Sequence, residues 1–236
     1  MVKASPDDLQ KLIGYRFREP ELLLQALTHS SFAREASGQV RDNEQLEFLG
    51  DAVLNFVVSS KLADAFPGHS EGNLSRARAR LVGAEHLSVV ASSLNLGSYL
   101  QLGHGEEKTG GRSKNRLAVD ALESLVAALY RDGGLPVAED FIARFILPAD
   151  LRDNEGQLFS VDYKSALQER LQAARQAVAS YRVVSEKGPE HRKMFIVEVS
   201  ALDATARGSG ESKKFAEQEA ARSMIEILER KRASDD

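Results

Sequence analysis

The 236-residue sequence contains no cysteine, which excludes disulfide bonds and thiolate metal sites. It also contains no apolar run long enough to span a bilayer: one of the longest, residues 52–58, is far too short. Residues 1–8 lack the apolar core of a secretory signal peptide. These absences fit a reducing compartment, and we expect a cytoplasmic protein with no membrane association.

Two familiar types of binding site are missing as well. The histidines, at positions 29, 69, 86, 104 and 191, are scattered and show no zinc-binding spacing. The glycines between positions 103 and 111 lack the Gly-Lys-Ser/Thr ending of a phosphate-binding loop, so no nucleotide cofactor is predicted. We interpret His29, in Thr28-His29-Ser30, as a structural hydrogen-bonding residue rather than a catalytic base.

Charge is divided unevenly along the chain. The net charge is −4 overall, but residues 1–155 carry 17 basic and 22 acidic residues, against 14 and 13 in residues 156–236. Cations bound to clustered acids in residues 1–155 would locally neutralise much of the excess negative charge of this part. Bulk charge therefore neither supports nor excludes a polyanionic partner.

Apolar residues in the first part recur at three- and four-residue spacing, which predicts helices, and no alternating pattern typical of strands occurs. The helical segments are residues 22–27, 46–66, 74–94, 117–130 and 138–146. We therefore predict an all-helical N-terminal domain over residues 1–150. The polar stretch that follows predicts a flexible linker over residues 151–160.

The pattern changes after the linker. Residues 161–177 and 212–231 have helical periodicity, and residues 180–185 and 194–199 have the composition of strands joined through a turn at Gly188-Pro189. A weaker third strand is predicted near residues 205–208. Residues 161–232 thus form a small α+β domain of order α-β-β-β-α, and the protein as a whole is multidomain.

The segment Asn43–Asp51 concentrates negative charge on one helical face. At about 100° per residue, Glu47 lies about 60° and Asp51 about 20° from Glu44, while Leu46 and Leu49 lie on the opposite side. Like charges at this spacing destabilise a helix by roughly 0.2–0.5 kcal/mol per pair, and no basic residue lies four positions away. Either the face is simply solvated, or a divalent cation neutralises it.

A second acidic pair favours the cation. Asp120 and Glu123 lie three residues apart on a helix whose leucines face the other way, although Arg116 could neutralise part of their charge. Two such helices packed through their apolar sides would leave their acidic edges free to converge. Carboxylates gathered in this way suit Mg²⁺ or Mn²⁺, which activate water and stabilise charge in phosphodiester cleavage.

These motifs resemble the ribonuclease III family. Asn43–Asp51 is similar to the family signature, and Asp120–Glu123 to its second acidic motif. Residues 12–17, 26–31 and 71–82 are similar to further family elements, in the same order, so the resemblance covers nearly the whole chain. Gln45 and Val119 stand where the family usually has arginine and alanine. The resemblance implies one nuclease domain followed by one double-stranded-RNA-binding domain.

The resemblance also implies roles for the acids. Glu47, Asp51, Asp120 and Glu123 would coordinate the catalytic Mg²⁺, with Mn²⁺ as a substitute; Asp51 and Glu123 would be the catalytic residues, and Glu123 the most critical. Glu44 would be a supporting acid. Water would attack the phosphodiester of double-stranded RNA and leave 5′-phosphate and 3′-hydroxyl ends, in the processing of ribosomal RNA precursors, messenger RNA and other structured transcripts.

Paired cuts on two strands need two sites, which implies a homodimer. Phe48 lies only about 40° from Glu44 on the acidic side of its helix, where a core role is awkward. Family resemblance places it at the dimer interface. Local burial against another helix is the alternative.

RNA contacts are expected from both domains. In the C-terminal domain the resemblance implies Gln168 on the first helix, Pro189 and His191 in the loop between strands, and Lys213 and Lys214 at the start of the last helix, where the helix dipole favours phosphate. In the N-terminal domain the basic loop 112–116 is a candidate for backbone contacts.

Two other functions compete. One is a catalytically silent RNA-binding or ribosome-assembly protein on the same scaffold, which the five intact acids argue against. The other is a two-metal nuclease acting on DNA, which the C-terminal domain disfavours.

Overall fold

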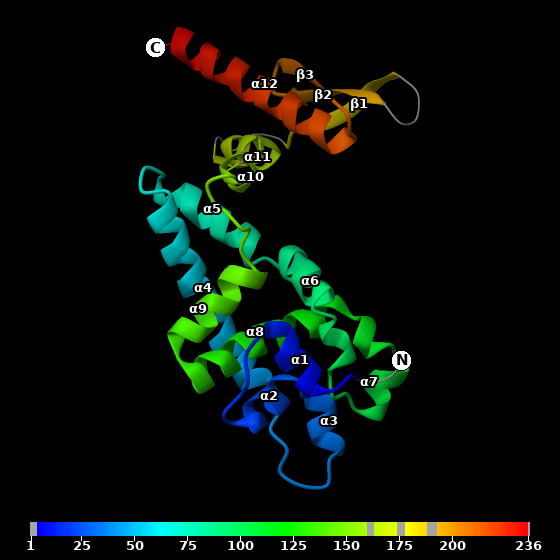
Figure 1. The fold of residues 1–236 in the computed structure, drawn as a ribbon. Coiled ribbons are helices and arrows are strands. Elements are labelled where there is room, and N and C mark those ends of the chain that lie inside the picture. Colours follow the sequence, from blue (N-terminus) through cyan, green and yellow to red (C-terminus); the bar gives the residue numbers. More distant parts are fainter. Residues whose placement is uncertain (1–3, 160–162, 174–177, 188–192, 236) are drawn as a thin grey trace. The chain divides into compact units, whose positions relative to one another are not determined.

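The chain folds into two compact units, Met1–Phe159 and Ser160–Asp236 (Figure 1). A computed structural model describes residues 4–159, 163–173, 178–187 and 193–235. No helix in the described part of the chain is both long and apolar enough to cross a membrane.

The N-terminal unit is helical throughout, as its periodicity predicted. It contains α1 (Pro6–Ile13), α2 (Pro20–Ala26), α3 (Ser30–Glu35), α4 (Glu44–Ala65), α5 (Glu71–Leu81), α6 (Ala84–Ser93), α7 (His104–Lys108), α8 (Asn115–Gly133), α9 (Leu135–Phe145) and α10 (Glu155–Leu158), with short 3-10 turns at η1 (Leu96–Ser98) and η2 (Gly111–Ser113). The pairing between Thr28 and Gln101 is an isolated bridge rather than part of a named strand.

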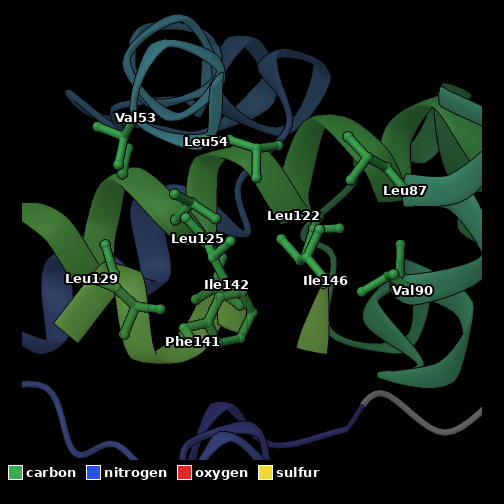
Figure 2. Packing of buried hydrophobic residues seen from close by; sticks show 14 of the residues in the cluster. Val53, Leu54, Leu87, Val90, Leu122, Leu125, Leu129, Phe141, Ile142 and Ile146 are labelled. Atoms are coloured by element: carbon green, nitrogen blue, oxygen red, sulfur yellow. The ribbon is translucent and has the colours of Figure 1, made fainter. Parts of the chain in front are cut away.

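Helix α8 is the centre of the core. Its leucines and small residues are almost completely buried, and α2, α4, α6 and α9 all pack against it. Figure 2 shows Leu122, Leu125 and Leu129 of α8 among side chains of the neighbouring helices. A helix that is apolar around most of its circumference is stable only when it is surrounded in this way.

The most extensive helix contact joins α4 and α8. It depends on Gly50, because a Cβ atom at this position would lie 1.8 Å from the backbone oxygen of Glu123. No side chain larger than hydrogen fits there without separating the helices. The glycine of the acidic segment therefore sets how closely the two acidic helices approach.

Two segments differ from the sequence-based expectation. The helical pattern over residues 74–94 is divided into α5 and α6 at Gly83, whose missing side chain leaves room for the carbonyl oxygen of Ala79. The glycine-rich stretch 103–111, outside the predicted helical segments, contains the short helix α7. The presence of glycine alone therefore does not show where a helix begins or ends.

A long-range polar contact ties the N-terminal segments to the end of α8. The Asp132 carboxylate accepts a 2.6 Å hydrogen bond from the Tyr15 hydroxyl, and bonds from the backbone N–H groups of Arg18 and Glu19. Burial and the bond to Asp132 raise the pKa of Tyr15 to about 12. Tyr15 therefore remains a neutral donor, and the α1–α2 loop is fixed to α8.

Most of the predicted linker is folded onto the N-terminal unit, and this corrects the expectation of a flexible segment for residues 151–159. Leu158 is buried in the core, and Phe159 packs edge-to-face on Phe66 and stacks on His69. Arg80 donates to the carbonyl oxygens of Gln157 and Leu158. The polar composition of this segment suggested mobility, but the two apolar residues at its end, Leu158 and Phe159, pack against the N-terminal unit.

The C-terminal unit has the predicted order. It consists of α11 (Tyr163–Ala173), β1 (Ser180–Lys187), β2 (Met194–Ala201), β3 (Ala204–Gly210) and α12 (Lys213–Asp235). The strands form an antiparallel sheet in the order β1-β2-β3, with a register shift between Val183 and Ser185. Val197 and Val199 face α12 and α11 across a separate small core.

Replacing Gly50 by alanine tests the close contact between α4 and α8. The added methyl group must displace backbone, so we expect a loss of about 1–3 kcal/mol in the free energy of unfolding. Denaturant titration measures this loss. Gly68→Ala is a matched control because a Cβ there meets nothing within 4 Å. A Gly50→Ala protein as stable as the control would show that the helices can move apart freely.

Candidate functional site

Four of the predicted acids face one another across the α4–α8 contact. Glu47 and Asp51 lie on α4, on either side of Gly50, and Asp120 and Glu123 lie on α8. Asp51 is exposed, whereas the other three are partly buried. The arrangement follows from the two amphipathic helices, which bury their apolar sides and leave the acidic edges together.

The four carboxylates affect one another strongly. Burial, and then the charges of Asp51, Glu47 and Asp120, raise the pKa of Glu123 to about 7. Burial and then Asp120 raise the pKa of Glu47. Burial also raises the pKa of Asp120, against opposing effects of Arg116 and His29. Without a cation, at least one of these groups therefore tends to hold a proton near neutral pH.

Polar neighbours hold the cluster in place, and sequence reasoning missed two of them. Asn55 donates a 2.8 Å hydrogen bond to the Asp51 carboxylate from one turn further along α4. The buried Ser124 hydroxyl lies 2.7 Å from the Asp120 carbonyl oxygen and 3.2 Å from that of Asn43, and so links α8 to the start of α4. The i+4 spacing of Asn55 from Asp51 was the available signal.

Asn43 is buried, and its side chain makes no capping hydrogen bond to α4. Asp42 instead accepts a bond from the Glu44 N–H group at 3.2 Å. The Asn43 side chain therefore does not cap the helix that it precedes. Its side chain lines a cavity beside the acids.

This cavity has a volume of about 420 Å³ and is lined by groups of both charge signs. The acidic residues are Glu44, Glu47, Glu106 and Asp120, and the basic residues are His29, Lys114 and Arg116. Arg116 approaches Asp120 only to 3.9 Å, and most of its side chain is exposed to solvent. The hollow therefore combines anionic and cationic groups in a space large enough for a phosphate group.

The donor set fits a hard divalent cation. All four central groups are carboxylates, the ligand type that Mg²⁺ and Mn²⁺ prefer. Burial raises the pKa of Glu47, Asp120 and Glu123, and a bound cation would favour their charged forms. Within the described residues, no three Asp, Glu or His side chains are already arranged to hold an ion. Mg²⁺ commonly uses only one or two carboxylates, several waters and substrate phosphates, so a closed cage is not required.

Two further predicted residues extend from the same helix into solvent. Glu44 is exposed at the start of α4 and reaches the edge of the cavity. The Phe48 side chain is 82% exposed, so local burial within one chain does not explain it. Phe56, two turns further along α4, is 59% exposed. Together Phe48 and Phe56 form an apolar stripe beside the acidic cluster.

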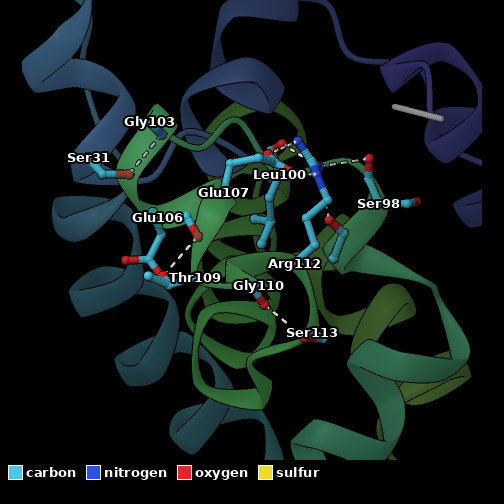
Figure 3. A network of polar contacts seen from close by, with 11 residues as sticks. Ser31, Ser98, Leu100, Gly103, Glu106, Glu107, Thr109, Gly110, Arg112 and Ser113 are labelled. Atoms are coloured by element: carbon cyan, nitrogen blue, oxygen red, sulfur yellow. Dashed lines mark hydrogen bonds and ion pairs between the residues drawn. The ribbon is translucent and has the colours of Figure 1, made fainter. Parts of the chain in front are cut away.

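In the basic loop before α8, Arg112 belongs to a network of polar contacts within the fold (Figure 3). Arg112 donates to the carbonyl oxygens of Gly97, Ser98 and Leu100, and forms a two-point ion pair with Glu107. Its guanidinium is thus occupied inside the fold, so Arg112 is a structural residue within the loop that was a candidate for RNA backbone contacts. Sequence reasoning could not detect these carbonyl partners, which have no side-chain signature.

Lys114 from the same loop reaches the cavity. Its ammonium group lies 2.6 Å from the Glu106 carboxylate of α7, and it donates to the Thr109 hydroxyl at 3.3 Å. The hydrogen bond from Lys114 lowers the pKa of Glu106. Glu106 is a cavity residue that the sequence analysis did not single out.

The predicted RNA-binding residues of the C-terminal unit are found on α11 and α12. Gln168 is half-buried on α11, and Lys213 and Lys214 are exposed at the start of α12. Lys213 pairs with Glu186 at 3.0 Å and lies over the Phe195 ring. Pro189 and His191 lie outside the described residues.

Sequence comparison identifies both units. Residues 19–150 match a family model described as ribonuclease-III-like, and residues 163–228 match the double-stranded RNA binding motif. Ribonuclease 3 of Solibacter usitatus is 47% identical over 96% of this chain and 88% of its own length. Ribonuclease 3 of Bdellovibrio bacteriovorus is 43% identical over 96% of this chain and 97% of its own length.

Structural comparison gives the same assignment for the first unit. The nuclease domain of ribonuclease III from Campylobacter jejuni, in a structure described as flexible in a region involved in dimer formation, superposes with a TM-score of 0.56 at 35% identity. It matches 66% of this chain and all of that chain. The helical fold, the α-β-β-β-α unit and the full-length similarity agree: this chain belongs to the ribonuclease III family.

Proposed function

We propose that this protein is an endoribonuclease that hydrolyses phosphodiester bonds of double-stranded RNA and leaves 5′-phosphate and 3′-hydroxyl ends. The observation that carries the proposal is the meeting of Glu47 and Asp51 with Asp120 and Glu123 across the α4–α8 contact. Relatives named ribonuclease 3 over nearly the whole chain support it.

Mg²⁺ is the proposed cofactor, with Mn²⁺ as a substitute. When bound, such a cation lowers the pKa of water and stabilises negative charge on a phosphate group. Glu47, Asp51, Asp120 and Glu123 would hold it. Asn55 fixes the Asp51 carboxylate, and the Ser124 hydroxyl links the backbones of α4 and α8, so both helices keep their acids in place.

The four acids differ in what they contribute. Glu123 is the acid whose pKa is raised most clearly, to about 7, so it gains most from a compensating positive charge. Asp51 is exposed and is oriented by Asn55, which suits a ligand that faces substrate. Glu44, further from the centre, is the supporting acid that we propose to act at the edge of the cavity.

The proposed substrate is double-stranded rather than single-stranded RNA. The C-terminal unit matches a double-stranded RNA binding motif, and such domains recognise the shape, 2′-hydroxyls and phosphates of A-form helices. Gln168 would contact a minor groove, while Lys213 and Lys214 would bind phosphates at the start of α12. Pro189 and His191 remain proposed contacts. Precursors of ribosomal RNA and structured messenger RNAs in the cytoplasm are the proposed natural substrates.

The proposed assembly is a homodimer joined through the exposed stripe of α4. Phe48 and Phe56 expose two aromatic rings on one helix, an arrangement that is costly in water and is relieved by burial against a partner. A second copy of the chain would place two acidic clusters near one duplex. Each cluster could then cut one strand.

Substituting Glu123 separates cleavage from binding. We expect Glu123→Ala to reduce cleavage of a long RNA duplex in Mg²⁺ at least about 100-fold, since even outer-shell partners of metal ligands cost up to that amount. A gel shift with the same duplex should be unchanged, because Lys213 and Lys214 are intact. Glu85→Ala, at an exposed site on α6, is the control that should keep full activity.

The same assay separates the competing functions. Duplex DNA and a chelator serve as additional conditions. Uncut RNA with the wild-type protein in Mg²⁺ would favour a silent RNA-binding protein, and equal cutting of DNA would favour a DNA nuclease. Loss of both cleavage and binding in Glu123→Ala would mean that the residue is structural.

The raised pKa of Glu123 predicts a pH-dependent stability in the absence of divalent cations. A carboxyl group with a folded-state pKa of about 7 and an ordinary value of 4.5 favours folding below pH 4.5, and this contribution is lost as the pH rises through 7. At pH 8, Glu123→Gln should therefore be more stable than the wild type by about 1–3 kcal/mol, allowing for solvent screening.

Denaturant titrations in chelator at pH 5 and pH 8 measure this difference, which should shrink at pH 5. Added Mg²⁺ at pH 8 should stabilise the wild type more than the variant, because a ligand stabilises the state that binds it. A variant less stable than the wild type at pH 8 would contradict the electrostatic explanation.

Phe48→Ala tests the proposed dimer. Because the ring is 82% exposed within one chain, its removal should leave the monomer fold intact but weaken association, and sedimentation analysis should show a shift toward monomer. Val89→Ala, at a 65% exposed apolar residue on α6, is the matched control and should stay dimeric. If the Phe48→Ala protein remains dimeric, the stripe of Phe48 and Phe56 on α4 is not the dimer interface.

A further inference from the structure

The hydrogen bonds of His29 fix which ring nitrogen carries the proton. His29 precedes α3, and its Nδ1 atom accepts a bond from the Ser31 N–H group at 3.2 Å. The Ser31 hydroxyl lies 2.8 Å from the same Nδ1 and itself accepts a bond from the Gly103 N–H group at 2.9 Å. The hydroxyl proton is therefore directed at Nδ1, and the neutral ring carries its own proton on Nε2.

The position of the ring is fixed by backbone bonds on both sides. The His29 N–H group donates to the Gln101 carbonyl at 3.0 Å, and the Gln101 N–H group donates to Leu27 at 2.8 Å. The Asn43 N–H group donates to the Thr28 carbonyl at 2.9 Å, next to the start of α4. His29 is thus held, through its neighbour Thr28, beside the segment that begins the acidic helix.

His29 also lines the cavity beside the acids, together with Glu47 and Asp120. Among the described residues, none forms a hydrogen bond with its Nε2 atom. The residue is half-buried, and Nε2 is not one of the fully buried polar atoms that lack a partner. An N–H donor without a protein acceptor is therefore accessible in a residue that lines a hollow large enough for a phosphate group.

We propose that the Nε2–H group of His29 donates a hydrogen bond to a phosphate oxygen of the duplex RNA backbone, and so positions the RNA against the acidic cluster. This inference rests on the proposed function and deepens it. A hydrogen bond to a charged oxygen is shorter and stronger than one between neutral groups. Lys114 and Arg116, which also line the cavity, add positive charge for the same group.

The geometry distinguishes this role from that of a general base. A base needs an unprotonated nitrogen facing the substrate, whereas the unprotonated nitrogen of His29 is the one bound by Ser31. Ser31 is accordingly a positioning residue, which acts on RNA only by orienting His29. The sequence analysis assigned His29 a structural hydrogen bond; the structure adds a second, accessible donor on the same ring.

Two substitutions of His29 test the hydrogen bonds of Nδ1 and Nε2 separately. Asn at position 29 keeps an acceptor near Nδ1, which suits the start of a helix, but has no donor at the place of Nε2. Gln at this position reaches further and can present its amide N–H group to the cavity, but loses the bond with Ser31. The experiment measures kcat/KM on a long RNA duplex in Mg²⁺, duplex binding by gel shift in chelator, and thermal stability.

We expect His29→Asn to lose roughly 10- to 100-fold in kcat/KM, the effect of removing a hydrogen bond to a charged group, while its stability and gel shift stay near those of the wild type. His29→Gln should be less stable but retain more activity than His29→Asn. The order of activity and the order of stability should therefore be opposite.

The same order in both measurements, or wild-type activity in His29→Asn, would overturn the phosphate contact and leave His29 with only its structural bond. Failure of the proposed function gives a different result, because the wild-type protein would then leave the duplex uncut. Cleavage by the wild type with unaffected cleavage by His29→Asn would overturn only the inference about His29.

Discussion

The contact between α4 and α8 at Gly50 is the constraint on which the rest of the structure depends. It brings the two longest helices of the N-terminal unit together at a distance that no larger residue permits. The core of the unit forms around α8 because of this contact, and the acidic edges of both helices meet for the same reason. Gly50 therefore determines two things at once: how closely α4 and α8 pack, and how far apart their carboxylates lie.

The close approach of α4 and α8 gathers several partly buried carboxylates, whose charged forms are disfavoured there. Burial raises the pKa of Glu47, Asp120 and Glu123, and repulsion from neighbouring acids raises the pKa of Glu47 and Glu123 further. A fold selected for stability alone would replace such groups by apolar ones. Their presence at the most extensive helix contact is what functional sites commonly show, since strongly shifted pKa values are found where binding or catalysis requires them.

Much of this architecture could be predicted from the sequence, because periodicity reports which face of a helix is buried. The helical N-terminal unit, the α-β-β-β-α unit and the facing acids of α4 and α8 all follow from it. The anchoring of Leu158 and Phe159, and the occupation of Arg112 by backbone carbonyls, do not. Those features depend on partners far away in the chain. Every residue has a backbone carbonyl group, so the sequence does not show which one will accept a hydrogen bond.

The contact between Tyr15 and Asp132 has a consequence for how the chain reaches its native state. Its two residues are 117 positions apart, and the Gly50–Glu123 contact likewise joins the first half of the unit to α8. Contacts at such separations form late, because the loop between them must first be closed. During synthesis, α1 to α6 therefore leave the ribosome before the helix that completes their core exists, and the N-terminal unit becomes native only after residue 132 has emerged.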